Sequence, residues 1–410
     1  NFLVEWGMTR STIDVCLYVY QEGDLTLWVA IYVDDALIVD NSAQLRARFV
    51  SDLSNRFPTE DKGDLKWILN VEISRDRPAR TLTMSQELYI QDLLSKYSDD
   101  IDGTFSRRFD SPMDDSVDLS PEADPDGQNV TVEQRDKYMS IVGGLLWLAN
   151  MTRYDIAYSS CQLSRVLTRP RRVHYRAAMR VLAYLRGTRH RVLVFRPNGD
   201  KGLDTLVDSS WATKFSCSGA MFFMHGCLFH WFSKLQRSVT LSSAEAEYFG
   251  AMLATRDLIF IRELLIEVRC GVRGPSAILC DSKSAVDMAF DPVAFKKTKH
   301  ILRAAEFLRD LVARDVIVMR HVSGSVMVAD ILTKAVARQL FVDLLALIDA
   351  YASDGLACPV PRSVSQQGGP SAAPLPGPPQ QPPPSPPASP PSFLRLRGAG
   401  PEGSGCDVCA

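Results

Sequence analysis

Short apolar runs separated by turn residues open the chain. Residues 25–33 are apolar and β-prone, two aspartates follow, and residues 36–39 are apolar again. Two β-prone runs joined by turn-forming residues predict a β-hairpin. Asp34 and Asp35 are expected at its tip, where both carboxylates lie near solvent and within reach of a metal ion.

A second series of short apolar runs lies in the last third of the chain. His225 and Gly226 are expected to form the turn between two of these runs. Residues 299–313 have the periodicity of an amphipathic helix. Strands mixed with helices predict an α/β (α+β) fold with a five-stranded sheet. The expected strands are residues 204–208, 220–224, 228–233, 277–280 and 316–322.

A long helix is predicted to begin at residue 242. Ser242 and Glu245 have the spacing of a capping box, which gives Glu245 a structural role at the helix start. Glu247 is then the acid left to face the sheet. Ala251 and Ala254 follow it at helical spacing, and their small side chains would let the helix lie close to the sheet.

Four acids stand at the ends or beginnings of these elements. Asp208 ends one predicted strand, Asp281 follows another, and Glu247 and Asp330 lie in first turns of helices, with Asp330 expected to begin the last helix. Clustered carboxylates repel one another unless cations lie between them. A pair of Mg²⁺ ions, with Mn²⁺ as the alternative, is the expected occupant. Each acid alone could instead be an ordinary strand-end or helix-start residue.

Charge is unevenly distributed, although the net charge is only −2. Residues 165–196 contain ten arginines and no acid, which favours a track for phosphates over a solvated helix face. Arg171, Arg172 and Arg176 are the candidates for nucleic-acid contact. Residues 92–136 contain thirteen acids against four bases and several Pro and Gly residues, and are expected to form a surface loop or linker.

The nine cysteines are scattered, and most are expected to be reduced core residues. These are Cys16, Cys161, Cys217, Cys227, Cys270 and Cys280. The lone Cys406–Cys409 pair is weak evidence for zinc. No signal peptide and no apolar stretch of membrane-spanning length occur, so no membrane partner is expected.

Proline dominates the last part of the chain. Residues 359–401 hold 15 of the 24 prolines, so residues 346–410 are predicted to be a disordered or polyproline II tail. Such a tail could recruit SH3 or WW domains.

Five strings in the second half resemble the ribonuclease H domain of copia-type LTR retrotransposon polyproteins. Each string alone is weak, but five in the family order over about 130 residues are specific. The strings are Asp208 with Trp211-Ala212, residues 242–248 (SSAEAEY), Cys280-Asp281, Thr298-Lys299-His300, and residues 329–334 (ADILTK).

Residues 32–35 (YVDD) resemble the reverse transcriptase palm of the same family, and residues 82–90, 138–157 and 178–188 resemble the segment that follows it. The resemblance implies a partial palm and thumb at 1–110, a connection at 111–200, a ribonuclease H-like domain at 201–345 and the tail at 346–410. The family's first polymerase aspartate is expected upstream of Asn1, so the chain alone is expected not to polymerise DNA.

The resemblance implies two-metal cleavage of the RNA strand of an RNA–DNA hybrid by Asp208, Glu247, Asp281 and Asp330. It also implies an RNA template, Asp34 and Asp35 as polymerase metal ligands, and other parts of the polyprotein as partners. A basic cluster is expected to hold phosphates: Lys296, Lys297, Lys299 and His300. The resemblance makes His321 a candidate proton carrier near the last Asp, but its place inside a predicted strand favours packing in the core. Two alternatives stay open, a catalytically dead relic that only binds nucleic acid and a host protein that uses the tail.

Overall fold

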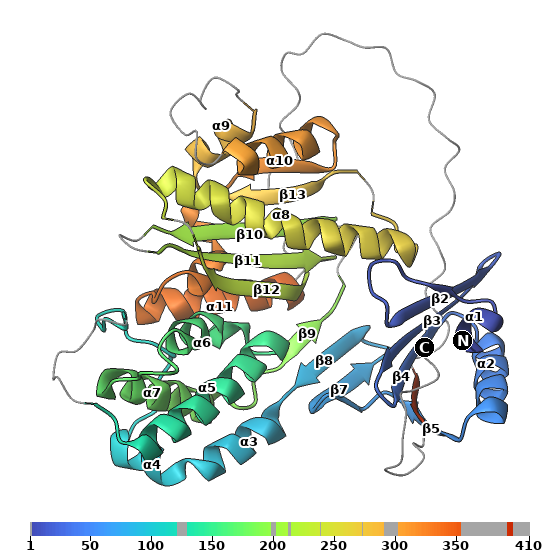
Figure 1. Cartoon of the computed structure of the whole chain (residues 1–410), viewed down its shortest axis with the longest axis horizontal. Coiled ribbons are helices and arrows are strands. Elements are labelled where there is room, and N and C mark those ends of the chain that lie inside the picture. The colour runs from blue at the N-terminus through green and yellow to red at the C-terminus, as the bar shows by residue number, and fades with distance from the viewer. Residues whose placement is uncertain are drawn as a thin grey trace. The chain divides into compact units, whose positions relative to one another are not determined.

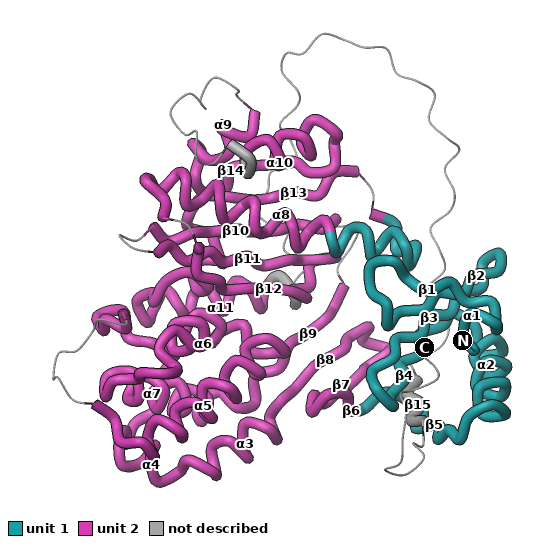
Figure 2. Tube along the Cα trace, in the orientation of Figure 1, with its two compact units in different colours: residues 1–66, 260–271, 361–410 teal, residues 67–259, 272–360 magenta. Residues whose placement is uncertain are grey.

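The structure is a computed structural model, and its chain divides into two compact units (Figure 2). Unit 1 comprises residues 1–66, 260–271 and 361–410, and unit 2 comprises residues 67–259 and 272–360. The described residues are 2–120, 129–197, 202–211, 215–237, 239–272, 274–290, 302–353 and 392–396.

Unit 1 is built on a sheet in the order β1-β2-β3-β4-β15-β5. The predicted hairpin is confirmed, because β3 and β4 pair antiparallel with Tyr32 opposite Asp35. Val33 at the turn has φ 56°, so Asp34 lies at the tip and Asp35 opens the second strand. The elements are α1 (Phe2–Glu5), β1 (Thr9–Arg10), β2 (Leu17–Glu22), β3 (Leu25–Tyr32), β4 (Asp35–Asp40), α2 (Ala43–Arg56), β5 (Thr59–Asp64) and β15 (Ser392–Leu396).

The first part of unit 2 combines a small antiparallel sheet, β6-β7-β8-β9, with a group of helices. Its helices are α3 (Glu87–Lys96), α4 (Ser98–Thr104), α5 (Val132–Met151), η1 (Tyr154–Ile156), α6 (Ala157–Ser164) and α7 (Arg172–Thr188). Its strands are β6 (Trp67–Ile68), β7 (Val71–Asp76), β8 (Thr81–Ser85) and β9 (Leu193–Phe195). The buried faces of α5 and α7 share one apolar core with the next sheet.

The second part of unit 2 is the predicted mixed five-stranded sheet, in the order β12-β11-β10-β13-β14. β10 pairs antiparallel with β11 and parallel with β13, and β14 runs parallel to β13. The turn at His225 and Gly226 is confirmed, because both residues have positive φ. The strands are β10 (Leu203–Ser210), β11 (Cys217–Met224), β12 (Cys227–Leu235), β13 (Ser276–Cys280) and β14 (Ile317–His321).

Helices flank this sheet, and α8 runs along it in Figure 1. α8 begins where the capping pattern predicts, because Ser242 Oγ accepts the backbone N–H of Glu245. Glu245 accepts the N–H of Leu241, one residue before the expected partner. The helices are α8 (Ser243–Glu267), α9 (Lys283–Phe290), α10 (Leu302–Ala313), η4 (Gly324–Val326), η5 (Val328–Leu332) and α11 (Arg338–Ser353).

Three expectations about the helices and loops were wrong. The acidic stretch is not simply a loop: residues 92–96 and 98–104 are helical, and Asp100, Asp102 and Asp114 pair with neighbouring helices. Asp330 does not begin the last helix, because it lies in the 3₁₀ helix η5. The helix α11 extends past residue 346.

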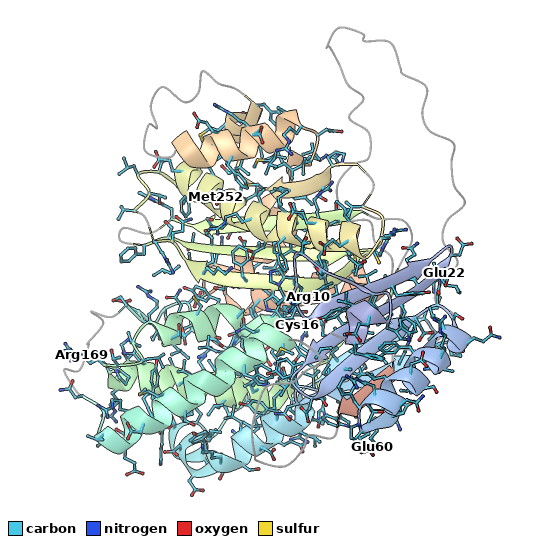
Figure 3. The ribbon with its side chains drawn as sticks, turned by 45° about the vertical axis from the view of Figure 1, so that its right-hand side comes forward. Arg10, Cys16, Glu22, Glu60, Arg169 and Met252 are labelled. Atoms are coloured by element: carbon cyan, nitrogen blue, oxygen red, sulfur yellow. The ribbon has the colours of Figure 1, made fainter. Side chains whose placement is uncertain are left out.

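Two of the cysteines expected in the core, Cys16 (labelled in Figure 3) and Cys270, are exposed instead. The buried ones are Cys217, Cys227 and Cys280. Apart from β15, the predicted tail from residue 354 on lies outside the described residues, as does the Cys406–Cys409 pair. Among the helices of the described residues, none has both the length and the apolar character needed to cross a membrane.

Candidate functional site

The fold brings four acids that are distant in sequence to one edge of the five-stranded sheet. Asp208 lies near the end of β10, and Asp281 directly follows β13, its parallel neighbour. Carboxyl ends of parallel strands open at the same sheet edge, where α/β folds place ligands. Glu247 reaches this edge from the first turns of α8, and Asp330 reaches it from η5.

The approach of the four side chains is close. Asp208 lies near enough to Glu247 and Asp330 that, after burial, its charge raises the pKa of each. The Cys280 thiol lies 3.9 Å from Oε2 of Glu247. Ligand atoms of Glu247, Cys280 and Asp281 all lie within 4.8 Å of one another. The structure therefore brings together the four acids that the sequence singled out.

Small residues permit this approach. A Cβ on Gly250 of α8 would overlap Oγ of Ser209, so the helix contacts β10 directly. Ala251 and Ala254 are fully buried, which agrees with the close approach of helix and sheet that the sequence predicted. A Cβ on Gly219 of β11 would lie 2.5 Å from Cβ of Leu332 in η5. These contacts fix the elements that carry Glu247 and Asp330.

Two residues of the ADILTK string complete the cluster, although the sequence analysis assigned them no role. Thr333 is buried and donates its hydroxyl to Oδ2 of Asp208. The ammonium of Lys334 lies 2.8 Å from Oδ1 of Asp330 and 3.7 Å from Oδ2 of Asp208. The sequence signal that could have identified Thr333 and Lys334 is their position in the same motif as Asp330.

Burial and the neighbouring carboxylates disfavour ionisation of Glu247, Asp281 and Asp330. Burial, followed by the charges of Asp208 and Asp281, raises the pKa of Glu247 to about 9. Burial and Asp208 raise the pKa of Asp330 to about 7. The same two causes raise the pKa of Asp281. Carboxylates held in this way are stabilised by a cation placed between them.

The donor set suits divalent cations. Four carboxylates offer the hard oxygen ligands that Mg²⁺ prefers, and Mn²⁺ accepts the same ligands. The thiol of Cys280 is a softer neighbour, but burial raises its pKa and keeps it protonated. The residues present therefore fit divalent cations held by oxygen ligands.

His321 corrects an expectation. It was predicted to pack in the core, but it is exposed at the end of β14. Its Nε2 lies 3.0 Å from the backbone carbonyl of Asp281. Periodicity within a strand could not show this, because the last residue of a strand can project past the sheet edge.

The other predicted acids, Asp34 and Asp35, lie in unit 1. The neighbouring side chains Tyr32 and Val33 are 57% and 70% exposed, so the hairpin tip is open to solvent. Asp34 and Asp35 themselves are only half-buried, and Oδ1 of Asp35 is shielded from solvent, so the two acids are less exposed than the sequence predicted.

Several arginines of residues 165–196 form ion pairs with acids of the same unit, which the sequence did not predict. Arg180 pairs with Asp114 at 3.0 Å, and Arg186 pairs with Asp102 at 2.6 Å. Arg191 pairs with Asp349 at 2.8 Å. These three arginines therefore balance acids within unit 2.

The three arginines chosen as nucleic-acid contacts lie at the start of α7. Arg172 and Arg176 are exposed, and Arg171 is partly exposed. The guanidinium of Arg176 lies 5.4 Å from the ring centre of Phe105. Their role in binding stays a prediction. The predicted basic cluster of Lys296, Lys297, Lys299 and His300 lies outside the described residues.

Comparison with known proteins supplies an independent view. Residues 1–104 match the family model described as reverse transcriptase (RNA-dependent DNA polymerase). The chain is 32% identical over 352 residues to the retrovirus-related Pol polyprotein from transposon TNT 1-94 of Nicotiana tabacum, covering 83% of this chain and 26% of that protein. It is 30% identical over 256 residues to the putative transposon Ty5-1 protein of Saccharomyces cerevisiae, covering 61% of this chain and 80% of that protein.

A solved structure also resembles part of the chain. The N-terminal ribonuclease H domain of a Mycobacterium tuberculosis protein, fused to maltose-binding protein, is 18% identical with a TM-score of 0.25. The match covers 38% of this chain and 99% of that chain. The chain spans about a quarter of the length of the plant polyproteins that it matches.

Proposed function

Since this chain belongs to the Pol polyproteins of copia-type retrotransposons, we propose that its carboxylate cluster hydrolyses the RNA strand of RNA–DNA hybrids. The observation that carries the proposal is the meeting of Asp208, Glu247, Asp281 and Asp330 at one sheet edge from four separate elements. Structural acids at strand ends and helix starts need not converge, and convergence carries an electrostatic cost.

The cluster's residues would hold a pair of Mg²⁺ or Mn²⁺ ions. When bound, such a pair supplies Lewis acidity and lowers the pKa of an attacking water. Asp208 is the central member of the cluster, because, after burial, its charge acts on both Glu247 and Asp330 and raises the pKa of each. Thr333 orients the Asp208 carboxylate by donating a hydrogen bond to it.

The choice of RNA as the cleaved strand rests on chemistry rather than on base sequence. The 2′-OH distinguishes RNA from DNA at a given phosphate. A backbone held by basic side chains is bound without sequence readout, because phosphate contacts position a strand and do not specify it. Arg171, Arg172 and Arg176 are the proposed contacts among the described residues.

The polymerase half is proposed to contribute separately. Residues 1–104 match the reverse transcriptase family, and the two adjacent carboxylates of Asp34 and Asp35 at the β3–β4 turn are the proposed metal ligands at a nucleotide site. An RNA template is the corresponding partner. This role concerns unit 1 and does not bear on hydrolysis at the carboxylate cluster.

Replacement of one ligand tests the proposal. Asp281→Asn should reduce Mg²⁺-dependent cleavage of an RNA–DNA hybrid by at least about 100-fold, because even residues that only support metal ligands are worth 10- to 100-fold. Asp287→Asn is the matched control, since Asp287 is exposed on α9 six residues later. Equal cleavage by both variants would contradict the proposal, and absence of cleavage by the unmodified chain would favour a relic that only binds nucleic acid.

A further inference from the structure

Lys334 lies at the mouth of the carboxylate cluster. Its ammonium is 2.8 Å from Oδ1 of Asp330 and 3.7 Å from Oδ2 of Asp208. The Lys334 side chain is 45% exposed, while those of Asp330 and Asp208 are 15% and 4% exposed. One positive charge thus bridges two acids from the solvent side.

The local backbone explains why this lysine reaches both acids. Lys334 follows Asp330 by four residues, and its backbone N–H donates to the Asp330 carbonyl at 3.3 Å. Thr333, the residue directly before Lys334, is buried against Asp208. Asp330 and Lys334 therefore project on the same side of one helical turn.

An incoming cation needs the same carboxylate oxygens. An ammonium and a divalent ion repel each other, so both cannot lie against Asp208 and Asp330 at full occupancy. Lysine is a compact charge on a flexible four-carbon stem, and this stem is half in solvent. The side chain can therefore leave the carboxylates without moving η5.

We propose that Lys334 is a tethered counter-ion that holds Asp208 and Asp330 together before metal binds and yields both carboxylates to the metal. The proposal rests on the proposed function of the cluster. Once displaced, the ammonium remains within one side-chain length of the site, where the phosphate of a bound nucleic-acid strand is its natural partner. Lys334 is thus a positioning residue. Its removal should strengthen the binding of metal and weaken the binding of the nucleic-acid substrate.

The opposite signs separate this role from a merely structural one. If the only role of Lys334 were to stabilise η5, its removal would leave the Asp330 side chain less well positioned and would weaken metal binding. If it competes with metal, its loss should tighten metal binding while it weakens the binding of hybrid. A single unit charge a few ångströms away corresponds to about tenfold in affinity at an effective dielectric near that of water.

The test uses the full chain and Mn²⁺ as the probe. Lys334→Met, which removes the charge and keeps the stem, should lower the Kd for Mn²⁺ in isothermal titration by about tenfold. It should also raise the KM for hybrid. Lys334→Arg keeps the charge and should restore Kd toward that of the unmodified chain. Lys334→Gln provides a second neutral variant in case the Met variant folds poorly.

Two results are decisive. An unchanged or higher Kd for Mn²⁺ in both neutral variants would overturn the counter-ion role. Asp208→Asn serves to distinguish the metal site from the counter-ion. If Asp208→Asn leaves Mn²⁺ binding intact, the proposed metal site itself fails, whereas loss of binding in Asp208→Asn with no tightening in Lys334→Met refutes only the counter-ion role.

Discussion

Thr333 donates its hydroxyl to the carboxylate of Asp208, a residue 125 positions earlier in the chain. Both residues are buried, at 1% and 3% exposure. The bond joins the turn after η5 to the central strand β10, and so it fixes the side of the cluster on which Asp330 and Lys334 lie.

Loss of this hydroxyl should be costly. Thr333→Val has nearly the same shape but leaves a buried carboxylate oxygen without its donor, which costs about 1–3 kcal/mol. Urea unfolding should show this decrease in the free energy of unfolding, whereas Thr333→Ser should remain close to the unmodified chain. A Val variant as stable as the Ser variant would show that the hydroxyl is dispensable.

Gly219 should be sensitive to a single added methyl group. Its Cβ would lie 2.5 Å from Cβ of Leu332 and 2.9 Å from Cγ2 of Thr333, so Gly219→Ala must displace η5. Overpacking of this kind costs about 1–3 kcal/mol. Because η5 carries Asp330, Mn²⁺ affinity should fall together with stability.

Gly202→Ala is the control for that variant. Gly202 lies at the start of the same sheet region, and a Cβ there meets nothing within 4 Å. Thermal unfolding of the two variants should differ clearly. Equal melting temperatures would mean that η5 yields to the added methyl group at little cost.

The metal-free protein should lose stability as pH rises. The pKa of Glu247 is raised from 4.5 to about 9, and that of Asp330 from 3.8 to about 7. The folded state therefore holds protons that the unfolded state releases above about pH 4.5. Below about pH 4 both groups contribute their full stabilisation to the folded state. The contribution of Asp330 is lost as the pH rises to about 7, and that of Glu247 is lost as the pH rises to about 9.

Unfolding in EDTA between pH 5 and 9 measures this effect, and Glu247→Gln should flatten the upper part of the profile. Saturating Mg²⁺ should reverse the trend, because cation binding favours the deprotonated carboxylates and adds stability to the folded state. A profile that rises with pH in EDTA would be inconsistent with the buried cluster.

The arginines at the start of α7 should contribute to binding without sequence preference. Replacing Arg171, Arg172 and Arg176 by Gln should weaken hybrid affinity alike for all sequences. The slope of log affinity against log salt should decrease by about 0.7 to 0.9 for each phosphate that is no longer neutralised. Filter binding or fluorescence anisotropy over a salt series would measure both quantities.

The control is a second triple variant, which changes three exposed arginines at the end of the β7–β8 hairpin. It replaces Arg75, Arg77 and Arg80 by Gln. Its salt slope should equal that of the unmodified chain. An equal change in both triple variants would assign the effect to net charge rather than to a defined binding surface.

The sequence alone determined the strands of the five-stranded sheet, their order along the chain and the start of α8. Strand alternation fixed β10 to β14 within a few residues, and the capping pattern fixed the start of α8, because these signals depend on neighbours a few positions apart. The hairpin with Asp34 at its tip follows from the same local rules. The four acids could be selected because each adjoins an element end.

Which charged side chains pair with one another was decided only by the tertiary structure. The arginine-rich run could not reveal that Arg180 and Arg186 pair with Asp114 and Asp102, because those partners lie 66 and 84 residues away. His321 lies inside an apolar pattern, yet it projects beside Asp281. Local periodicity tells which side of an element a residue faces but not what another element places there, so the pairing of distant charges is settled by packing.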